Sequence, residues 1–270
     1  MIKHFLYGMI LAGLLIPGAA RSQSRKDKHK GKLVWSDEFN TPGRPDTTRW
    51  GYDIGTGGNG WGNNELQYYT DRSENARIEN GVLILEARRD SLNGKAYTSS
   101  RLVTRKKGDW LYGYVEVKAK LPKGRGTWPA IWMLSTDWSY GGWPESGEID
   151  IMEEVGYDPD VIHGTAHSKS YNHVIGTQKE GKITLPGSQD NFHVYALRWT
   201  PDKMDFLIDD KIFHTVAREP RDDFKGWPFD KRFYLILDIA VGGNWGGKEG
   251  VDPSIWPQRM EVDYVRVYQQ

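Results

Sequence analysis

Apolar and polar residues alternate with a period of two along much of this chain, and this alternation restricts the fold more than any other feature. Residues 114–121, 232–241 and 260–269 carry it most clearly and are rich in Val, Ile and Tyr. Because successive side chains of a strand point to opposite faces of a sheet, each run predicts a β-strand with a buried face. No stretch shows the period of an amphipathic helix.

Turn residues between the runs predict how the strands connect. Asn80-Gly81 separates two apolar runs, and further turns are predicted at 200–203 and at Asp209-Asp210. Many short strands joined by such turns predict an all-β fold, a sandwich of two antiparallel sheets. A chain of 270 residues that is 38% hydrophobic can bury a sizeable core. We therefore assign residues 33–270 to one domain.

Residues 1–22 predict a secretory signal peptide. A basic start is followed by an apolar run at 5–16 and by small residues at 18–20, which is the typical order. The alternative, a membrane anchor, needs about 18 uninterrupted apolar residues, whereas glycines and a proline interrupt this run. The basic, polar spacer 23–32 is expected to be disordered. We expect the mature protein to be secreted or periplasmic, without membrane attachment.

The composition argues against several classes of function. Thirty-six Lys and Arg balance 36 Asp and Glu, so no net field gathers nucleic acid or anionic lipid. Cysteine is absent, which excludes disulfides, thiolate metal sites and cysteine nucleophiles. We expect a monomer with a neutral partner, stabilised by core packing with or without a metal ion.

The stretch "SGEIDIMEEVG", residues 146–156, carries four carboxylates among apolar residues. In a strand, Glu148 and Asp150 share one face and their apolar neighbours take the other. Strict alternation would then turn Glu153 into the core, where an unpaired carboxylate costs several kcal/mol. A β-bulge near Ile151–Met152 would return it to the acidic face. We therefore predict a bulge.

The predicted spacing of the acids fits a particular chemistry. With the bulge, the Cα atoms of Glu148 and Glu153 lie about 13 Å apart, and side chains leaning toward each other bring the carboxyls to about 5 Å, the separation of retaining glycosidases. Asp150 between them shifts their charge balance. Two alternatives remain open: a metal site, since Ca²⁺ binds clustered carboxylates, and a solvated acidic face, to which we assign Glu154.

The chain resembles glycoside hydrolase family 16, in its laminarinase-like, endo-β-1,3-glucanase branch. The stretch "GEIDIMEEVG" looks like the family signature Glu-x-Asp-x-x-Glu, with the extra Met of that branch. Further matches follow in the family's order and together span residues 33–270. They are "WSDEFN" (35–40), "GWGNNELQYYT" (60–70), "GYVEVKAKLPKGRGTWPAIWML" (113–134), "GTAHS" (164–168), "HVYALRWTPDKMDFLIDD" (193–210) and "LDIAVGGNWGG" (237–247).

The resemblance implies a concanavalin-like β-jelly roll of two curved antiparallel sheets, with the substrate in a cleft on the concave sheet. It implies that Glu148 is the nucleophile of a double displacement, Glu153 the acid/base and Asp150 the assisting carboxylate. The charge on Glu148 should raise the pKa of Glu153 and keep it protonated for its first task. No cofactor is then needed for catalysis.

Two aromatic residues are candidates for sugar contact. Trp128 and Trp132 are four apart on one strand face and offer flat apolar surfaces to sugar rings; a core position is the alternative. We favour the cleft because Pro129 limits ladder pairing and argues against a central strand. The resemblance places His167 in the cleft, whereas His163 is assigned a structural role.

Two Gly-rich loops supply further candidates. Asn64 and Glu65 in one loop, and Asn244 and Trp245 in the other, fit polar and stacking contacts with outer sugar units.

Many relatives bind Ca²⁺ on the convex side. The matching positions are the carbonyls of Glu38 and Gly81 and the carboxylate of Asp263, an oxygen-only set that suits Ca²⁺. The alternative is that Asp263 is an ordinary exposed acid of a strand. The ion would stabilise the chain ends.

The expected substrate is a β-1,3-glucan. Mixed-linkage glucans and algal galactans are alternatives within the family. A sulfated galactan would favour a basic cleft, for which the cluster Arg101, Arg105, Lys106 and Lys107 is a candidate, although a solvated turn explains it better. From other classes, a lectin-like binding module and a metal-dependent hydrolase remain alternatives.

Overall fold

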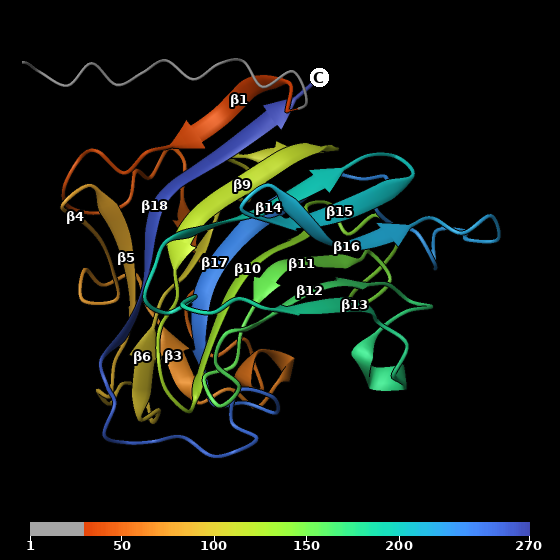
Figure 1. The fold of residues 1–270 in the computed structure, drawn as a ribbon. Coiled ribbons are helices and arrows are strands. Elements are labelled where there is room, and N and C mark those ends of the chain that lie inside the picture. Colours follow the sequence, from red (N-terminus) through yellow and green to blue (C-terminus); the bar gives the residue numbers. More distant parts are fainter. Residues whose placement is uncertain (1–29) are drawn as a thin grey trace, which may run out of the picture.

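The computed structural model describes residues 30–270, which form two eight-stranded antiparallel sheets packed face to face (Figure 1). The first sheet contains, in spatial order, β16 (Lys211–Ala217), β15 (Lys203–Ile208), β14 (His193–Trp199), β9 (Gly113–Lys120), β18 (Gln258–Gln269), β5 (Val82–Ala87) and β4 (Ala76–Glu79), with β1 (Lys32–Asp37) beside β18. The second contains β13 (Lys179–Thr184), β12 (Val161–His167), β11 (Glu148–Glu153), β10 (Thr127–Ser135), β17 (Phe233–Val241), β7 (Arg101–Val103) and β2 (Gly51–Tyr52), with β8 (Asp109–Trp110) beside β17.

The remaining elements are short. Strands β3 (Gln67–Tyr69) and β6 (Tyr97–Ser99) form a parallel pair, and η1 (Gly60–Gly62) and η2 (His173–Ile175) are 3₁₀ turns. Within residues 30–270 there is no α-helix, and hence no helix long and apolar enough to cross a membrane. The predicted all-β jelly roll of two antiparallel sheets is confirmed.

The alternation and the turns seen in the sequence explain the central strands. The three clearest runs became β9, β17 and β18, which lie inside the sheets. Asn80 and Gly81 join β4 to β5 with φ of 52° and 79°, and Asp209 and Asp210 join β15 to β16 with φ of 48° and 64°. Positive φ at both central residues is the geometry of tight hairpin turns, which Asn, Asp and Gly tolerate best.

The apolar faces of the two sheets meet in one core. Val117 and Leu197 of the first sheet and Ile131, Ile149 and Leu237 of the second are all fully buried in the same cluster. With its inner face in this core, the second sheet has its outer face free for a site.

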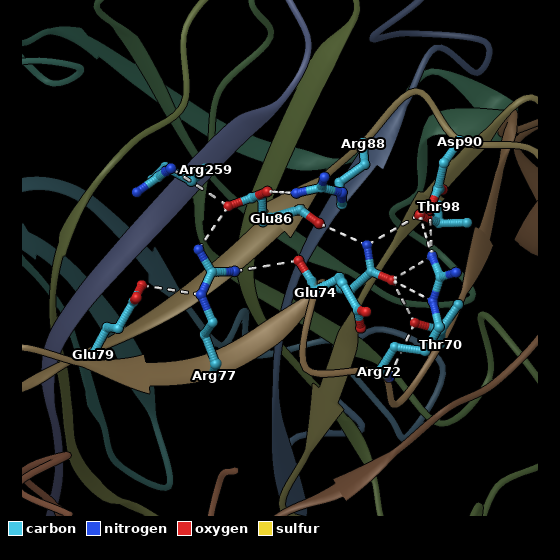
Figure 2. A network of polar contacts seen from close by, with 11 residues as sticks. Thr70, Arg72, Glu74, Arg77, Glu79, Glu86, Arg88, Asp90, Thr98 and Arg259 are labelled. Atoms are coloured by element: carbon cyan, nitrogen blue, oxygen red, sulfur yellow. Dashed lines mark hydrogen bonds and ion pairs between the residues drawn. The ribbon is translucent and has the colours of Figure 1, made fainter. Parts of the chain in front are cut away.

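A polar network on the first sheet joins β4, β5 and β18. The carboxylate of Glu86 is buried and pairs with Arg77 at 2.9 Å, with Arg88, and with Arg259 at 3.5 Å (Figure 2). Beside it, the side chain of Asn75 donates to the backbone carbonyl of Glu86 at 2.9 Å. One buried carboxylate thus ties the C-terminal strand to the β4–β5 hairpin.

The N-terminal edge of the domain begins earlier than expected. Lys32 already starts β1, and Lys30 Nζ pairs with the buried Glu116 at 2.8 Å. These last residues of the expected spacer therefore contact the sandwich. The predicted signal peptide, residues 1–22, lies outside the described residues.

Candidate active site

The predicted β-bulge is present in β11. Ala130 pairs with Glu153, Ile131 with Met152 and Trp132 with Asp150, so Ile151 is the extra residue. Ile151 and Met152 both join the core. The carboxylates on either side of the bulge consequently share the outer face of the second sheet.

Backbone pairing places Glu153 in a row of side chains that crosses this sheet. Glu153 pairs with His163 of β12 on one side and with Ala130 of β10 on the other. Ala130 pairs in turn with Asp238 of β17, and Asp238 with Arg101 of β7. All five residues line one groove.

The groove has a volume of about 840 Å³ and is walled by aromatic rings. Flat apolar walls with a few polar groups are typical of sites that bind a sugar chain. The tryptophans that line it are Trp61, Trp128, Trp132, Trp138, Trp143 and Trp245.

Trp128 and Trp132 lie in the groove. The inference from Pro129 that their strand is not central was wrong. Strand β10 is central and pairs with both β11 and β17, with Pro129 itself opposite Ile239. What directs the two rings outward is the alternation along β10, which sends Ile131 into the core. Their contact with sugar stays a prediction.

The carboxylates form a tight group around a histidine. His167 Nε2 lies 3.2 Å from Asp150 Oδ2 and 3.8 Å from Glu148 Oε1. Burial, followed by the charge of Asp150, raises the pKa of Glu148 to about 8, while His167 and Arg101 oppose the rise. Burial also raises the pKa of Asp150 well above its ordinary value. At neutral pH the group therefore holds at least one proton.

Glu153 accepts a hydrogen bond from a tryptophan of the groove wall. Trp128 Nε1 donates to Glu153 Oε1 at 2.9 Å, which favours the ionised form. Burial and the charge of Asp150 outweigh it and raise the pKa of Glu153 well above its ordinary value. The expected effect of the Glu148 charge is present, but it is smaller than these two.

Arg101 lines the groove, the less favoured of the two positions considered for it from the sequence. Its guanidinium carbon lies 4.4 Å from the ring centre of Trp61 and 4.6 Å from that of Trp132, and its Nε is 3.3 Å from Asp53 Oδ2. The assignment of this residue to a solvated turn was wrong, since Arg101 is 6% exposed. Its position on the face of β7 opposite to Leu102 was the signal available in the sequence.

Asp238 is a further groove carboxyl that was not predicted from the sequence. It accepts hydrogen bonds from Trp132 Nε1 at 3.3 Å and from the Tyr69 hydroxyl at 3.1 Å. Burial raises its pKa to about 7, while Arg101 lowers it. Asp238 is the one charged residue in the apolar run 233–241, and that was its signal.

Comparison with known proteins identifies the family. Residues 62–266 match the sequence model of "Glycosyl hydrolases family 16". The chain belongs to this family. A "Beta-glucanase" of Rhodothermus marinus is 53% identical over 266 residues, which cover 96% of this chain and 92% of that protein. A "Glucan endo-1,3-beta-glucosidase" of Cryptopygus antarcticus is 44% identical over 250 residues, 87% of this chain and 90% of that protein.

Solved structures agree with this assignment. The X-ray structure of the laminarinase from Rhodothermus marinus matches with a TM-score of 0.86 at 55% identity, covering 88% of this chain and 97% of that one. The expected membership of family 16 is therefore confirmed.

The Gly-rich loops of this family 16 chain reach the groove with one exception. Asn63, Glu65, Asn244 and Trp245 line it. Asn64 does not; its Nδ2 instead donates to Asn244 Oδ1 at 2.8 Å. Asn64 therefore connects one loop to the other. Asn63 occupies the groove position that was predicted for Asn64.

Two of the loop residues are fixed by their neighbours. Glu65 is 6% exposed and accepts a hydrogen bond from Gln67 Nε2 at 2.6 Å. Trp245 packs edge to face against Trp128, with ring centres 5.5 Å apart. The side chains of Glu65 and Trp245 are therefore held in fixed positions at the groove.

The assignment of Glu154 to a solvated acidic face was wrong. Glu154 is fully buried and contacts Ser188 Oγ at 2.8 Å and Gln189 Nε2. Ser188 Oγ also lies 2.9 Å from Asp160 Oδ1, and its single proton cannot serve both acids. A protonated Glu154 that donates to Ser188 satisfies all three groups, in agreement with burial raising its pKa to about 7.

One group of three side chains within residues 30–270 has the composition of a metal site. Glu148, Asp150 and His167 offer ligand atoms within 4.8 Å of one another. The metal alternative raised by the sequence therefore coincides with the carboxylate cluster.

The predicted calcium site contains competing cations. Asp263 lies where the pairing of β18 with β9 shifts register, and its Oδ2 is 2.8 Å from Lys118 Nζ. The Glu38 carboxylate accepts two hydrogen bonds from Arg266, both at 2.8 Å. Calcium at Asp263 would have to displace the lysine, and the assignment stays a prediction.

Proposed function

We propose that this chain is a secreted, monomeric endo-β-1,3-glucanase that hydrolyses laminarin-type glucan with retention of configuration. The observation that carries the proposal is the bulge in β11, which presents Glu148, Asp150 and Glu153 together in a tryptophan-walled groove. A pair of carboxyls flanking the scissile bond is what most glycosidases use. The names of the relatives, a β-glucanase, a glucan endo-1,3-β-glucosidase and a laminarinase, support a β-glucan substrate.

In the first step Glu148 attacks the anomeric carbon while Glu153 protonates the leaving oxygen. The new carbon–oxygen bond to Glu148 forms as the glycosidic bond breaks. Burial and the charge of Asp150 keep Glu153 protonated for this step. Burial and the charge of Asp150 raise the pKa of Glu148 to about 8, and His167 opposes this rise and so favours the ionised nucleophile.

In the second step water replaces the enzyme at the anomeric carbon. The ester has removed the charge of Glu148, and this lowers the pKa of Glu153. Glu153 accepts a proton from the attacking water, and Glu148 leaves as a carboxylate. Glu153 then carries a proton taken from the water, in place of the one it gave to the leaving oxygen, and no cofactor is needed.

A panel digest of laminarin, lichenan, agarose and carrageenan tests the substrate class. We expect reducing ends from laminarin first, and a loss of at least about 10³-fold in kcat for Glu148→Ala. Sugar affinity without any reducing ends, unchanged in this variant, would favour a lectin-like module. Faster release from agarose or carrageenan would favour a galactan hydrolase.

Removal of metal ions separates the remaining alternatives. We propose a structural Ca²⁺ held by Glu38, Gly81 and Asp263, so a chelator should lower the Tm and leave kcat unchanged at temperatures where the fold persists. Loss of kcat that follows metal occupancy of the group around Glu148 would favour a metal-dependent hydrolase instead.

A further inference from the structure

Glu154 is a buried carboxyl next to the proposed acid/base, and neither step of the double displacement uses it. Glu153 lines the groove, whereas Glu154 is fully buried and contacts the loop that joins β13 to β14, residues 185–192. The backbone N–H of Glu154 donates to the Pro129 carbonyl at 3.4 Å, which is long for a hydrogen bond. The closer connection of this end of β11 is made by the Glu154 side chain.

The contacts of Ser188 place a proton on Glu154. Asp160 Oδ1 accepts from the backbone N–H groups of Gly187 at 3.0 Å and of Ser188 at 3.1 Å, so it is also the acceptor toward the Ser188 hydroxyl at 2.9 Å. The one hydroxyl proton is then used, and Ser188 Oγ can only accept from Glu154 Oε2, 2.8 Å away. Gln189 Nε2 donates to the other oxygen, Glu154 Oε1. A neutral Glu154 satisfies all of these partners.

The titratable neighbours of Glu154 do not favour its ionised form. Two such side chains from other elements act on it, Asp160 in the turn before β12 and Tyr195 of β14. The charge of Asp160 opposes a second charge on Glu154. Burial raises the pKa of Tyr195 well above its ordinary value, so its hydroxyl stays neutral. The loop's own acid, Asp190, is exposed and pairs with Lys123 at the surface.

The loop 185–192 connects Glu154 to the first sheet. The Ser188 carbonyl accepts a hydrogen bond at 3.2 Å from the backbone N–H of Leu121, which directly follows β9. The loop then continues into β14 of the same sheet. The neutral Glu154 therefore joins the acid/base end of β11, in the groove sheet, to the sheet behind it.

We propose that Glu154 is a positioning residue for Glu153: as a neutral acid it fixes the end of β11 against the loop 185–192, and loss of its proton releases this end. Without that proton Ser188 can satisfy only one of its two acids, and a charge is buried. A displacement of about 1 Å at a catalytic group can cost about 10²-fold in rate. Turnover should therefore fall at alkaline pH while the substrate contacts of the groove persist. The inference rests on the proposed function, which gives Glu153 its role.

Glu154→Gln tests the proposal, because the amide donates to Ser188 and accepts from Gln189 as the neutral acid does, but it cannot ionise. At pH 6 we expect kcat on laminarin within about 2-fold of the native value. Burial raises the pKa of Glu154 to about 7, so about 90% of it is ionised at pH 8. The ratio of variant to native kcat should therefore rise about 3–10-fold from pH 6 to pH 8.5, with KM within about 2-fold. A ratio that does not change with pH, or a Gln variant that is inactive or unfolded at pH 6, would overturn the proposal.

Ser188→Ala removes the acceptor and leaves Glu154 in place. We expect kcat at pH 6 to fall about 3–10-fold, the loss of one hydrogen bond, with KM within about 2-fold because Ser188 does not line the groove. An unchanged kcat would contradict the role of this contact.

Glu116 provides a matched control. It is also a buried carboxyl, but it lies on β9 of the first sheet, outside the groove, and pairs with Lys30 at 2.8 Å. The ratio of kcat between Glu116→Gln and the native chain should be independent of pH. A rise equal to that of Glu154→Gln would overturn the assignment to Glu154.

Urea unfolding tests the buried proton without any glucan. The unfolded chain releases this proton near pH 4.5 and the folded chain near pH 7, so native stability falls as the pH rises between these values, whereas Glu154→Gln has no such proton. The unfolding constant of the native chain, divided by that of the variant, should rise at least about 10-fold from pH 5 to pH 7.5. A constant quotient would overturn the neutral Glu154. If the quotient rises but the native chain cleaves no glucan, the proposed function fails, and the positioning role fails with it.

Discussion

At the scale of single residues, the groove brings acidic groups together in partly or fully buried positions. Burial raises the pKa of Glu148, Asp150 and Glu153 alike, and the charge of Asp150 adds to the rise for its two neighbours. His167 and the indole of Trp128 act in the opposite direction. The balance of these contacts decides which carboxyl holds the proton.

Replacing Asp150 by Asn should move the pH profile of kcat/KM to lower pH. A negative neighbour raises the pKa of an acid, so removing it lowers the pKa of both Glu148 and Glu153. Both limbs of the profile should therefore shift in the acidic direction, and kcat at pH 7 should fall by about 10-fold or more. Limbs that stay in place or move to higher pH would contradict this electrostatic account.

Replacing Trp128 by Phe should shift the pH profile in the opposite direction, to higher pH. The variant keeps an aromatic ring and loses the N–H that donates to Glu153 at 2.9 Å. That donor stabilises the ionised carboxylate, so its loss raises the pKa of Glu153 and moves the alkaline limb to higher pH. The pH dependence of kcat/KM, measured beside Trp132→Phe as a control for the aromatic wall, checks the direction.

At the scale of elements, the bulge in β11 was predictable because a groove-facing acid and a core-facing acid differ by several kcal/mol. The prediction that Pro129 keeps β10 out of the middle of the sheet was wrong. Strand β10 can pair along either of its two edges independently, and along one of them it pairs with β17 at Pro129. The contact of Arg101 with Trp132 could not be read from the chain, since it depends on β7 lying beside β17. Alternation of apolar and polar residues predicts which face of the sheet a side chain lies on, but it does not predict which strands lie next to each other.

Changes in strand length at the bulge should have unequal effects. Deleting Ile151 leaves Met152 opposite Ile131 and Glu153 opposite Ala130 in regular register, so the acids keep their face and activity should fall less than about 100-fold. Inserting an alanine after Ile151 also allows strict alternation, but it moves Glu153 from opposite Ala130 to opposite Trp128, about 6.6 Å further along β10, and should abolish activity. Laminarin hydrolysis and urea unfolding of both variants measure this difference; equal losses would argue against the bulge as the device that aligns the acids.

The Glu86 network should stabilise the first sheet. Glu86→Ala leaves Arg77, Arg88 and Arg259 without their shared buried partner, and we expect the free energy of unfolding to fall by about 2–4 kcal/mol. Glu79→Ala is the matched control, because Glu79 is exposed and, among the described residues 30–270, pairs with Arg77 alone; its effect should stay below about 1 kcal/mol. Urea unfolding measures both, and similar small losses would show that the network adds little.

At the scale of the whole molecule, the fold class followed from alternation, turn residues and the lack of helical periods. The order of strands did not follow, because the pairs β9–β18 and β10–β17 join segments far apart in the sequence. The same holds for the groove end at His163, whose partners Glu180 and Gln178 come from β13 and the loop before it. The family motifs pointed to the acidic strand β11, and the three-dimensional pairing placed Arg101 in the groove and added Asp238 and the groove end at His163.

The stereochemistry of the first product tests the central claim, double displacement by Glu148 and Glu153, most directly. Laminarin or laminarihexaose is added to the enzyme in an NMR tube, and the anomeric protons of the new reducing end are followed before mutarotation. Two inversions at one carbon predict that the β-anomer appears first. Initial release of the α-anomer would contradict a covalent intermediate on Glu148 and the roles assigned to both glutamates.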